Sequence, residues 1–159
     1  MSTPQTHEQL IARFYSAFQA GDAETMAACY APDAQFEDPA FGQLDGAAAG
    51  DMWRMLIQRG GKDLQVQFSE VRGTPTGGSA LWEAHYLFGP ARRPVHNRIR
   101  TSFEIRDGQI VRHRDVFDFW RWSRMALGPT GLLLGWTPFM RAQVRKRSRG
   151  LLERFRRSG

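Results

Sequence analysis

Apolar residues recur at helical spacing near the start of the chain and alternate with polar residues farther on. Leu10, Ile11, Phe14 and Phe18 lie three or four positions apart, a pattern typical of an amphipathic helix. Gly21 marks the end of this helix, and Asp22 can cap the next one. The pattern predicts three N-terminal helices, over residues 7–20, 23–30 and 47–59.

After Gly61 the apolar period changes from that of a helix to that of a strand. Asp107 and Gly108 form a strong turn signal between the two longest alternating segments, which predicts a hairpin. The expected strands cover residues 34–38, 64–68, 81–88, 95–106 and 109–120, and the expected loops cover 42–46 and 73–79. This order predicts an α+β fold in which helices cover one face of a curved, mostly antiparallel sheet.

The length of 159 residues suits one domain with an appendage. The single cysteine, Cys29, excludes an internal disulfide. Residues 1–8 lack the apolar run of a secretion signal, so we expect a cytoplasmic protein. The net charge is +7 over residues 141–159 but −1 over residues 1–140, so the basic charge belongs to the tail. It does not indicate a nucleic-acid-binding fold, and we expect no nucleic acid partner.

The face on which each strand residue lies predicts a largely aromatic cavity. Side chains two positions apart share a face, so Asp38 accompanies Phe36, and His113 and Asp115 accompany Phe117. The same parity brings Asn97 and Thr101 onto one uncharged face, and Trp82 and Tyr86 onto another. Apolar walls with a few convergent polar groups are typical of a site for a small apolar ligand.

The segments FYSAFQAGDAETMAACYAPDAQFEDPAFG (14–42) and FEIRDGQIVRHRDVFDFW (103–120) resemble the nuclear transport factor 2-like superfamily. The nearest resemblance is to its SnoaL-like and ketosteroid-isomerase-like branches, over residues 7–122. It implies a cone-shaped α+β barrel around an apolar pocket, commonly in a homodimer. Members include isomerases, cyclases, dehydratases and epoxide hydrolases as well as proteins without enzymatic activity.

The resemblance also implies roles for individual residues. Asp38 matches the general base of the ketosteroid isomerases, and Asp115 matches an acid on the last long strand of the SnoaL-like cyclases. The two oxyanion donors of the isomerases correspond to Phe14, whose ring has no donor, and to Thr101. Tyr15 is adjacent to Phe14 but lies about 100° around the helix.

We therefore expect Asp38, Asp115 and His113 to be catalytic, because burial of a carboxyl among aromatic rings brings its pKa toward working pH. The expected substrate-binding residues are Phe14, Tyr15, Trp53, Trp82, Tyr86, Asn97, Thr101 and Phe117. No metal or cofactor is expected, because the histidines lack metal-ligand spacing. Two alternatives stay open: Asp38 as a turn residue before Pro39, and His113 with Asp115 as a structural pair.

Two functions fit these residues. One is an enzyme that transfers protons on an oxygenated hydrophobic substrate, as an isomerase, cyclase, dehydratase or hydrolase. The other is a ligand-binding or dimerisation module of the same fold without catalytic activity. A cavity filled by Trp82, Phe117 and Trp120 would favour the second function.

The chain after residue 126 is predicted to form a separate extension. Residues 128–138 form an apolar connector rich in Gly and Pro, and a helical pattern resumes at Phe139. Its apolar stripe holds Met140, Val144, Leu151, Leu152 and Phe155, and its basic face holds Arg145, Lys146, Arg149, Arg156 and Arg157. We expect the stripe to pack on the domain or on a second subunit. The alternative is contact with an anionic membrane, with Leu132 to Trp136 inserted beside the helix.

Overall fold

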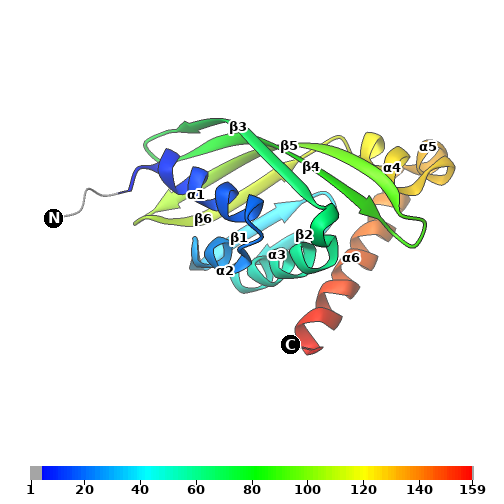
Figure 1. The fold of residues 1–159 in the computed structure, drawn as a ribbon, viewed down its shortest axis with the longest axis horizontal. Coiled ribbons are helices and arrows are strands. Elements are labelled where there is room, and N and C mark those ends of the chain that lie inside the picture. The colour runs from blue at the N-terminus through cyan, green and yellow to red at the C-terminus, as the bar shows by residue number, and fades with distance from the viewer. Residues whose placement is uncertain (1–4, 159) are drawn as a thin grey trace.

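The computed structural model describes residues 5–158, which form a curved six-stranded sheet with helices against it (Figure 1). The elements in chain order are α1 (His7–Gln19), α2 (Ala23–Ala28), β1 (Tyr30–Asp38), β2 (Gly42–Asp45), α3 (Gly46–Gly60), the 3-10 turn η1 (Gly61–Asp63), β3 (Gln65–Gly73), β4 (Gly77–Phe88), β5 (Arg93–Arg106), β6 (Gln109–Val116), α4 (Phe119–Leu127), α5 (Pro129–Leu134) and α6 (Pro138–Ser158).

The strand order is β2-β1-β6-β5-β4-β3, and every neighbouring pair is antiparallel except β1 with β6. The predicted α+β class and mostly antiparallel sheet are therefore confirmed. Helices α1 to α3 lie against one face of the sheet, and the main core forms between them.

Local signals in the sequence explain where the helices begin. Thr6 and Gln9 form a reciprocal capping box at α1, and the side chains of Asp22 and Asp45 accept backbone N–H bonds at the starts of α2 and α3. Strand β5 shows the predicted alternation along its length. Its odd-numbered residues from Val95 to Ile105 are buried, whereas Arg98, Arg100 and Glu104 are exposed.

Several predicted boundaries are wrong. Helix α2 ends at Ala28, and β1 begins at Tyr30, where the Ile110 amide donates to the Cys29 carbonyl. The predicted loop 42–46 contains strand β2, paired with the end of β1. The last strand stops at Val116, because the Asp118 side chain accepts from the Arg121 amide and starts α4. Residues 117–120 therefore do not continue the hairpin.

The C-terminal helices return to the body of the molecule. In α6, Leu152 is buried in the main core, with Leu151 and Phe155 packed beside it. Arg149 donates to the carbonyls of Phe41 and Gln43 at 2.9 and 2.8 Å. The apolar stripe thus packs on the domain, and the predicted connector contains the short helix α5. The division after residue 126, which lies within α4, stays a prediction.

Candidate active site

Asp38 lies where β1 ends, and Pro39 prevents the strand from continuing. Its Oδ1 accepts a 2.6 Å hydrogen bond from the Phe41 amide, which closes the tight turn into β2. The rest of the carboxylate faces a cavity, and the side chain stays partly accessible. Asp38 therefore stabilises the turn after Pro39 with one oxygen and faces the cavity with the other, so the two roles expected from the sequence are compatible.

The surroundings of Asp38 disfavour its charged form. Burial raises the pKa of Asp38 to about 7, and the nearby charge of Asp115 acts in the same direction. The Phe41 amide and the Arg145 guanidinium lower this pKa, but burial outweighs them. A carboxyl with a pKa near neutrality can both accept and donate a proton at working pH.

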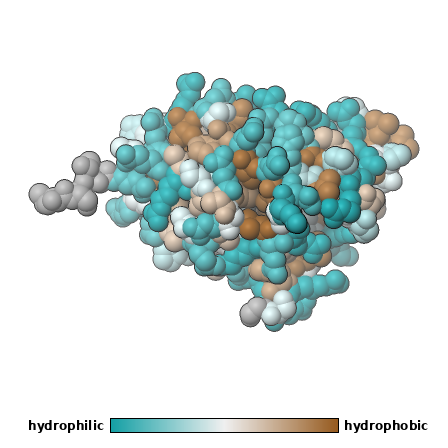
Figure 2. Space-filling model, viewed as in Figure 1, coloured by the Kyte–Doolittle hydropathy of each residue, from teal (hydrophilic) through white to brown (hydrophobic). Residues whose placement is uncertain are grey.

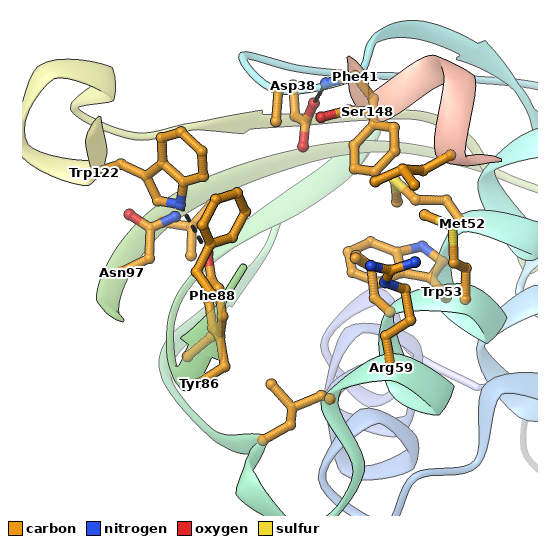
Figure 3. A pocket seen from close by; sticks show the side chains of 18 of the residues that line it. Asp38, Phe41, Met52, Trp53, Arg59, Tyr86, Phe88, Asn97, Trp122 and Ser148 are labelled. Atoms are coloured by element: carbon orange, nitrogen blue, oxygen red, sulfur yellow. Dashed lines mark hydrogen bonds between the residues drawn. The ribbon is translucent and has the colours of Figure 1, made fainter. Parts of the chain in front are cut away.

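The cavity has a volume of about 560 Å³ and is enclosed mostly by aromatic and aliphatic side chains. Figure 3 shows Asp38, Phe41 and Ser148 at one end of it. One wall carries Tyr86, Phe88, Asn97 and Trp122, and the opposite wall carries Met52, Trp53 and Arg59. The indole N–H of Trp122 donates to the Tyr86 hydroxyl at 2.8 Å, which holds these two rings in place.

Asp115 is the second acid at the cavity, and it ends a buried chain of hydrogen bonds. The Trp53 indole N–H donates to the Tyr30 hydroxyl at 2.9 Å, and this hydroxyl lies 2.7 Å from His113 Nδ1. His113 Nε2 lies 2.9 Å from Asp115 Oδ1. All four side chains are buried, and both Trp53 and Asp115 reach the cavity.

The chemistry of these groups determines which atom donates and which accepts in each of these hydrogen bonds. An indole nitrogen can only donate, so the Tyr30 oxygen accepts from Trp53. His113 Nδ1 is the only acceptor that the Tyr30 hydroxyl meets among the described residues, so the hydroxyl proton is assigned to that bond. His113 Nε2 then carries the imidazole proton and donates it to Asp115. With His113 in this tautomer, every donor in the series of hydrogen bonds has a partner. Asp115 thus has a fixed orientation and one of its oxygens already hydrogen-bonded.

The structure divides the expected site residues into two groups. Lining the cavity are Asp38, Asp115, Trp53, Trp82, Tyr86, Asn97 and Phe117. Buried behind its wall are His113, Phe14, Tyr15 and Thr101. Phe14, Tyr15 and Thr101 therefore do not line this cavity, and their contact with a ligand stays a prediction. Helix α1 packs directly on the sheet, where the rings of Phe14 and Tyr15 contact the ring of Phe103.

Three buried polar atoms lack a well-formed hydrogen bond within residues 5–158: Tyr15 Oη, Thr101 Oγ1 and Trp82 Nε1. Thr101 pairs directly with Asp115 across the β5–β6 ladder, and the Tyr15 and Thr101 hydroxyls lie near one another without good bonding geometry. Burial, followed by the charge of Asp115, raises the pKa of Tyr15 well above its usual range. Tyr15 is consequently a neutral hydroxyl at physiological pH.

Sequence reasoning missed several residues of the site. Tyr30 links Trp53 to His113, but it was assigned to a helix, and the shift in register between Tyr30 and Gln35 hides its parity with Phe36. Ser148 and Leu151 reach the cavity from α6, and Trp122 reaches it from α4. Strand parity cannot reveal helical residues that arrive from another part of the chain. Trp120, in contrast, points outward and does not fill the cavity.

Within residues 5–158 no three His, Cys, Asp or Glu side chains lie together in a way that could hold a metal ion. Asp38 and Asp115 instead lie among aromatic rings. The chemistry that these residues can perform is proton transfer, by Asp38 and at the end of the chain that reaches Asp115.

Comparison with solved structures identifies the same fold in other proteins. A protein of Xanthomonas campestris, proposed to be a polyketide cyclase, is 22% identical with a TM-score of 0.61, over 78% of this chain and 98% of its own. An NTF2-like protein of unknown function from Burkholderia pseudomallei is 17% identical with a TM-score of 0.64, over 75% and 95%. TerC, co-crystallised with polyporic acid, is 16% identical with a TM-score of 0.62, over 75% and 96%.

At these identities the likeness concerns the fold, and each structure leaves roughly a quarter of this chain unmatched. A comparison with curated protein sequences gives no match. The family model of the SnoaL-like domain matches residues 11–113, which is more than half of the chain. This match includes Asp38, Tyr30 and His113. The chain therefore belongs to the SnoaL-like domain family, within the NTF2-like fold.

Proposed function

We propose that this protein is a cofactor-independent acid–base enzyme of the isomerase or cyclase type, acting on a small oxygenated hydrophobic substrate. The observation that carries the proposal is the pair of acids at one apolar cavity. Asp38 has a pKa near 7 there, and Asp115 lies at the end of the hydrogen-bond chain through His113. A carboxyl group that only supports the fold rarely combines burial with a pKa near 7.

The first step follows from the state of Asp38. In its ionised form, Asp38 removes a proton from a carbon beside a substrate carbonyl, and the electron pair of the broken C–H bond moves to the carbonyl oxygen as an enolate. Aromatic walls exclude water, so the carboxylate meets the substrate without a full hydration shell. The oxygen of Asp38 that does not bond the Phe41 amide is available for this step.

The second step distinguishes the two reaction types. In an isomerase, the protonated Asp38 returns its proton to a different carbon of the enolate. In a cyclase, the enolate carbon forms a bond to a second carbonyl carbon of the same molecule, whose C=O electron pair moves to oxygen, and the resulting alkoxide takes back the proton that Asp38 removed. Asn97 lines the cavity, and its side-chain amide makes no hydrogen bond to the described residues, so it is available to bind a substrate oxygen.

Both reaction types share the enolate, and this makes the proposal testable before the natural substrate is known. The protein is incubated in D₂O with steroid enones, 1,3-dicarbonyl polyketide analogues and oxygenated terpenoids, and deuterium uptake is followed by mass spectrometry. We expect catalysed exchange with at least one class. Asp38→Asn should slow it by about a hundredfold or more, as is typical when a general base is lost.

Binding is measured in parallel by quenching of tryptophan fluorescence, because Trp53, Trp82 and Trp122 line the cavity. Asp38→Asn preserves the shape of the side chain and an oxygen for the Phe41 amide, so binding should persist. Binding without exchange in the wild-type protein would refute the enzyme and support the ligand-binding module. Equal exchange by the wild-type protein and Asp38→Asn would exclude Asp38 as the base.

A further inference from the structure

We propose that one end of the molecule docks on an anionic lipid surface. The docking element is the α5 tip, defined as Leu132, Leu133, Leu134, Trp136 and Phe139. Leu133, Trp136 and Phe139 are 68%, 67% and 64% exposed, and the other two leucines are also exposed. Figure 2 shows hydrophobic surface at the end of the molecule that α5 occupies in Figure 1.

Helix α5 has its small residues inside and its large apolar residues outside. Gly131 and Gly135 are buried against α4, so closely that a Cβ at Gly131 would overlap the Ser123 carbonyl oxygen. A Cβ at Gly135 would lie 2.6 Å from the Ser123 Cβ. This packing fixes α5 and directs its leucines outward. A helix stabilised only by its own domain would have the opposite arrangement.

The carbonyl groups at the end of α5 are satisfied without water. The Trp120 indole donates to the Leu132 carbonyl at 3.1 Å, and the Trp136 indole donates to the Leu133 carbonyl at 2.9 Å. The Gly135 amide bonds the Gly131 carbonyl, and Thr137 donates to the Leu134 carbonyl from both its amide and its hydroxyl. Internal satisfaction of backbone groups is the condition for entering a lipid environment, where no water can replace a missing bond.

The charge around the α5 tip is of one sign. From Phe119 to Leu152 the chain contains seven Arg or Lys residues and no Asp or Glu. Arg121 and Arg124 are exposed on α4, and the Arg124 guanidinium lies 4.2 Å from the centre of the Trp120 ring. Exposed leucine and tryptophan flanked by cations are typical of segments that bind the surface of an anionic membrane.

The same charges argue against a second copy of the chain as the partner of this surface. A symmetric contact through the α5 tip would bring together two positively charged segments that contain no Asp or Glu, and these would repel one another. The homodimer implied by the family resemblance stays a prediction, and it would use another surface. No helix within residues 5–158 is long and apolar enough to cross a bilayer, so the proposed contact is peripheral.

Docking would also bring the cavity close to the lipid. Trp120 and Trp122 are two positions apart on α4, which places them about 200° around the helix from one another. Trp120 is exposed and bonds the α5 tip, whereas Trp122 lines the cavity. One helix of about 10 Å diameter therefore separates the docked surface from the cavity. A hydrophobic ligand dissolved in a membrane would be within reach of the cavity.

The test is co-sedimentation of the full chain with phosphatidylcholine vesicles, with and without about one-third phosphatidylserine. We expect salt-sensitive binding only to the anionic vesicles. The double variant Leu133→Ser, Trp136→Ser should lower the partition coefficient at least about tenfold, because each buried apolar side chain contributes about that factor. Arg121→Gln with Arg124→Gln should also lower it about tenfold.

Matched control variants make the same kinds of substitution on another surface, so they test whether the effect depends on the position of the substituted residues. Val116→Ser removes a half-exposed apolar residue of β6, and Arg112→Gln with Arg114→Gln removes the same charge from that strand. Both controls should bind anionic vesicles like the wild type. Equal binding by the α5 tip variant, equal binding to neutral vesicles, or no binding at all would overturn the proposal. If the α5 tip variant changes a dimer into a monomer by light scattering, and neither form binds vesicles, the surface pairs two copies instead.

Discussion

Asp38→Asn should change the pH dependence of stability in a direction set by the environment of Asp38. Burial raises the pKa of Asp38 from 3.8 to about 7 in the folded protein. Between these values the folded chain holds a proton that the unfolded chain has released. Stability associated with neutral Asp38 is therefore fully present below about pH 4 and is lost as the pH rises through about 7. The asparagine variant has no such loss.

The size of the effect follows from the two pKa values. The difference between 3.8 and about 7, at about 1.4 kcal/mol per pKa unit, gives a total loss of about 4 kcal/mol. This value is an upper bound, because the Asp38 side chain stays partly accessible and solvent screens part of the effect. Part of the loss is complete by pH 5, so about 2–3 kcal/mol remains between pH 5 and pH 8. That is a large part of the total stability of a typical domain.

Urea unfolding of the wild type and the variant at a series of pH values measures the difference directly. Other titrating groups contribute equally to both proteins and cancel. Asp38→Asn should gain stability relative to the wild type by about 2–3 kcal/mol as the pH rises from about 5 to about 8. Asp22→Asn is the matched control, because Asp22 also accepts a backbone N–H three residues on. Hydrogen bonds from Thr25 lower the pKa of Asp22, so its difference should stay constant over this range.

Two results would contradict this reasoning. A difference for Asp38→Asn that does not change with pH would mean that Asp38 is hydrated as it is in the unfolded chain. A difference of the opposite sign would mean that the Phe41 amide or Arg145 stabilises the carboxylate more than burial destabilises it. Either result would also remove the basis for Asp38 as a base that works near neutral pH.

Three further predictions concern the site and its support. The rate of substrate deuterium exchange should rise with pH and level off above about pH 7, as ionised Asp38 accumulates, and a profile that falls over this range would exclude Asp38 as the base. Tyr30→Phe should lower the free energy of unfolding, measured in urea, by about 2–4 kcal/mol, because Trp53 Nε1 and His113 Nδ1 both lose their hydrogen-bond partner in a buried site. A loss under about 1 kcal/mol would show that these hydrogen bonds are not needed for stability. Arg149→Ala removes two bonds to the β1–β2 turn, so amide hydrogen exchange should become faster in residues 39–44 and in α6, whereas Arg154→Ala, a change at an exposed α6 residue, should leave both segments as in the wild type.

The sequence predicted the fold well because its signals are local and repeated. Alternation along β5 and β6 defines both faces of the sheet. Because a slip of one residue would move the apolar side chains from the buried face to the exposed face, only one register of pairing is stable. The wrong element boundaries occur where the local sequence pattern is compatible with either a strand or a helix. Residues 117–120 alternate like a strand, but Asp118 also caps a helix, and packing of Phe119 and Trp122 into a second core decides for the helix.

The candidate site was predictable only where strand parity applies. Asp38, Asp115 and Phe117 reach the cavity, whereas Phe36, the parity partner of Asp38, is buried in the main core. The link from His113 through Tyr30 to Trp53 joins β6, β1 and α3, and no spacing in the chain reveals such a contact. Strand parity likewise gives no information on Tyr15, whose place behind the cavity wall is set by how α1 packs on the sheet.

The C-terminal helices explain how a common fold can acquire a particular selectivity. The family match ends at residue 113, within β6, and everything after α4 begins lies outside it. That outer part provides Trp122, Ser148 and Leu151 to the cavity, whereas Asp38 comes from the shared part. Arg149 in α6 also bonds the turn that holds Asp38. Substitutions in α6 are therefore expected to alter the cavity wall through Ser148 and Leu151, and the turn beside Asp38 through Arg149. Selectivity for a substrate is thus expected to depend on α4 and α6, and the proton transfer itself on residues of the sheet.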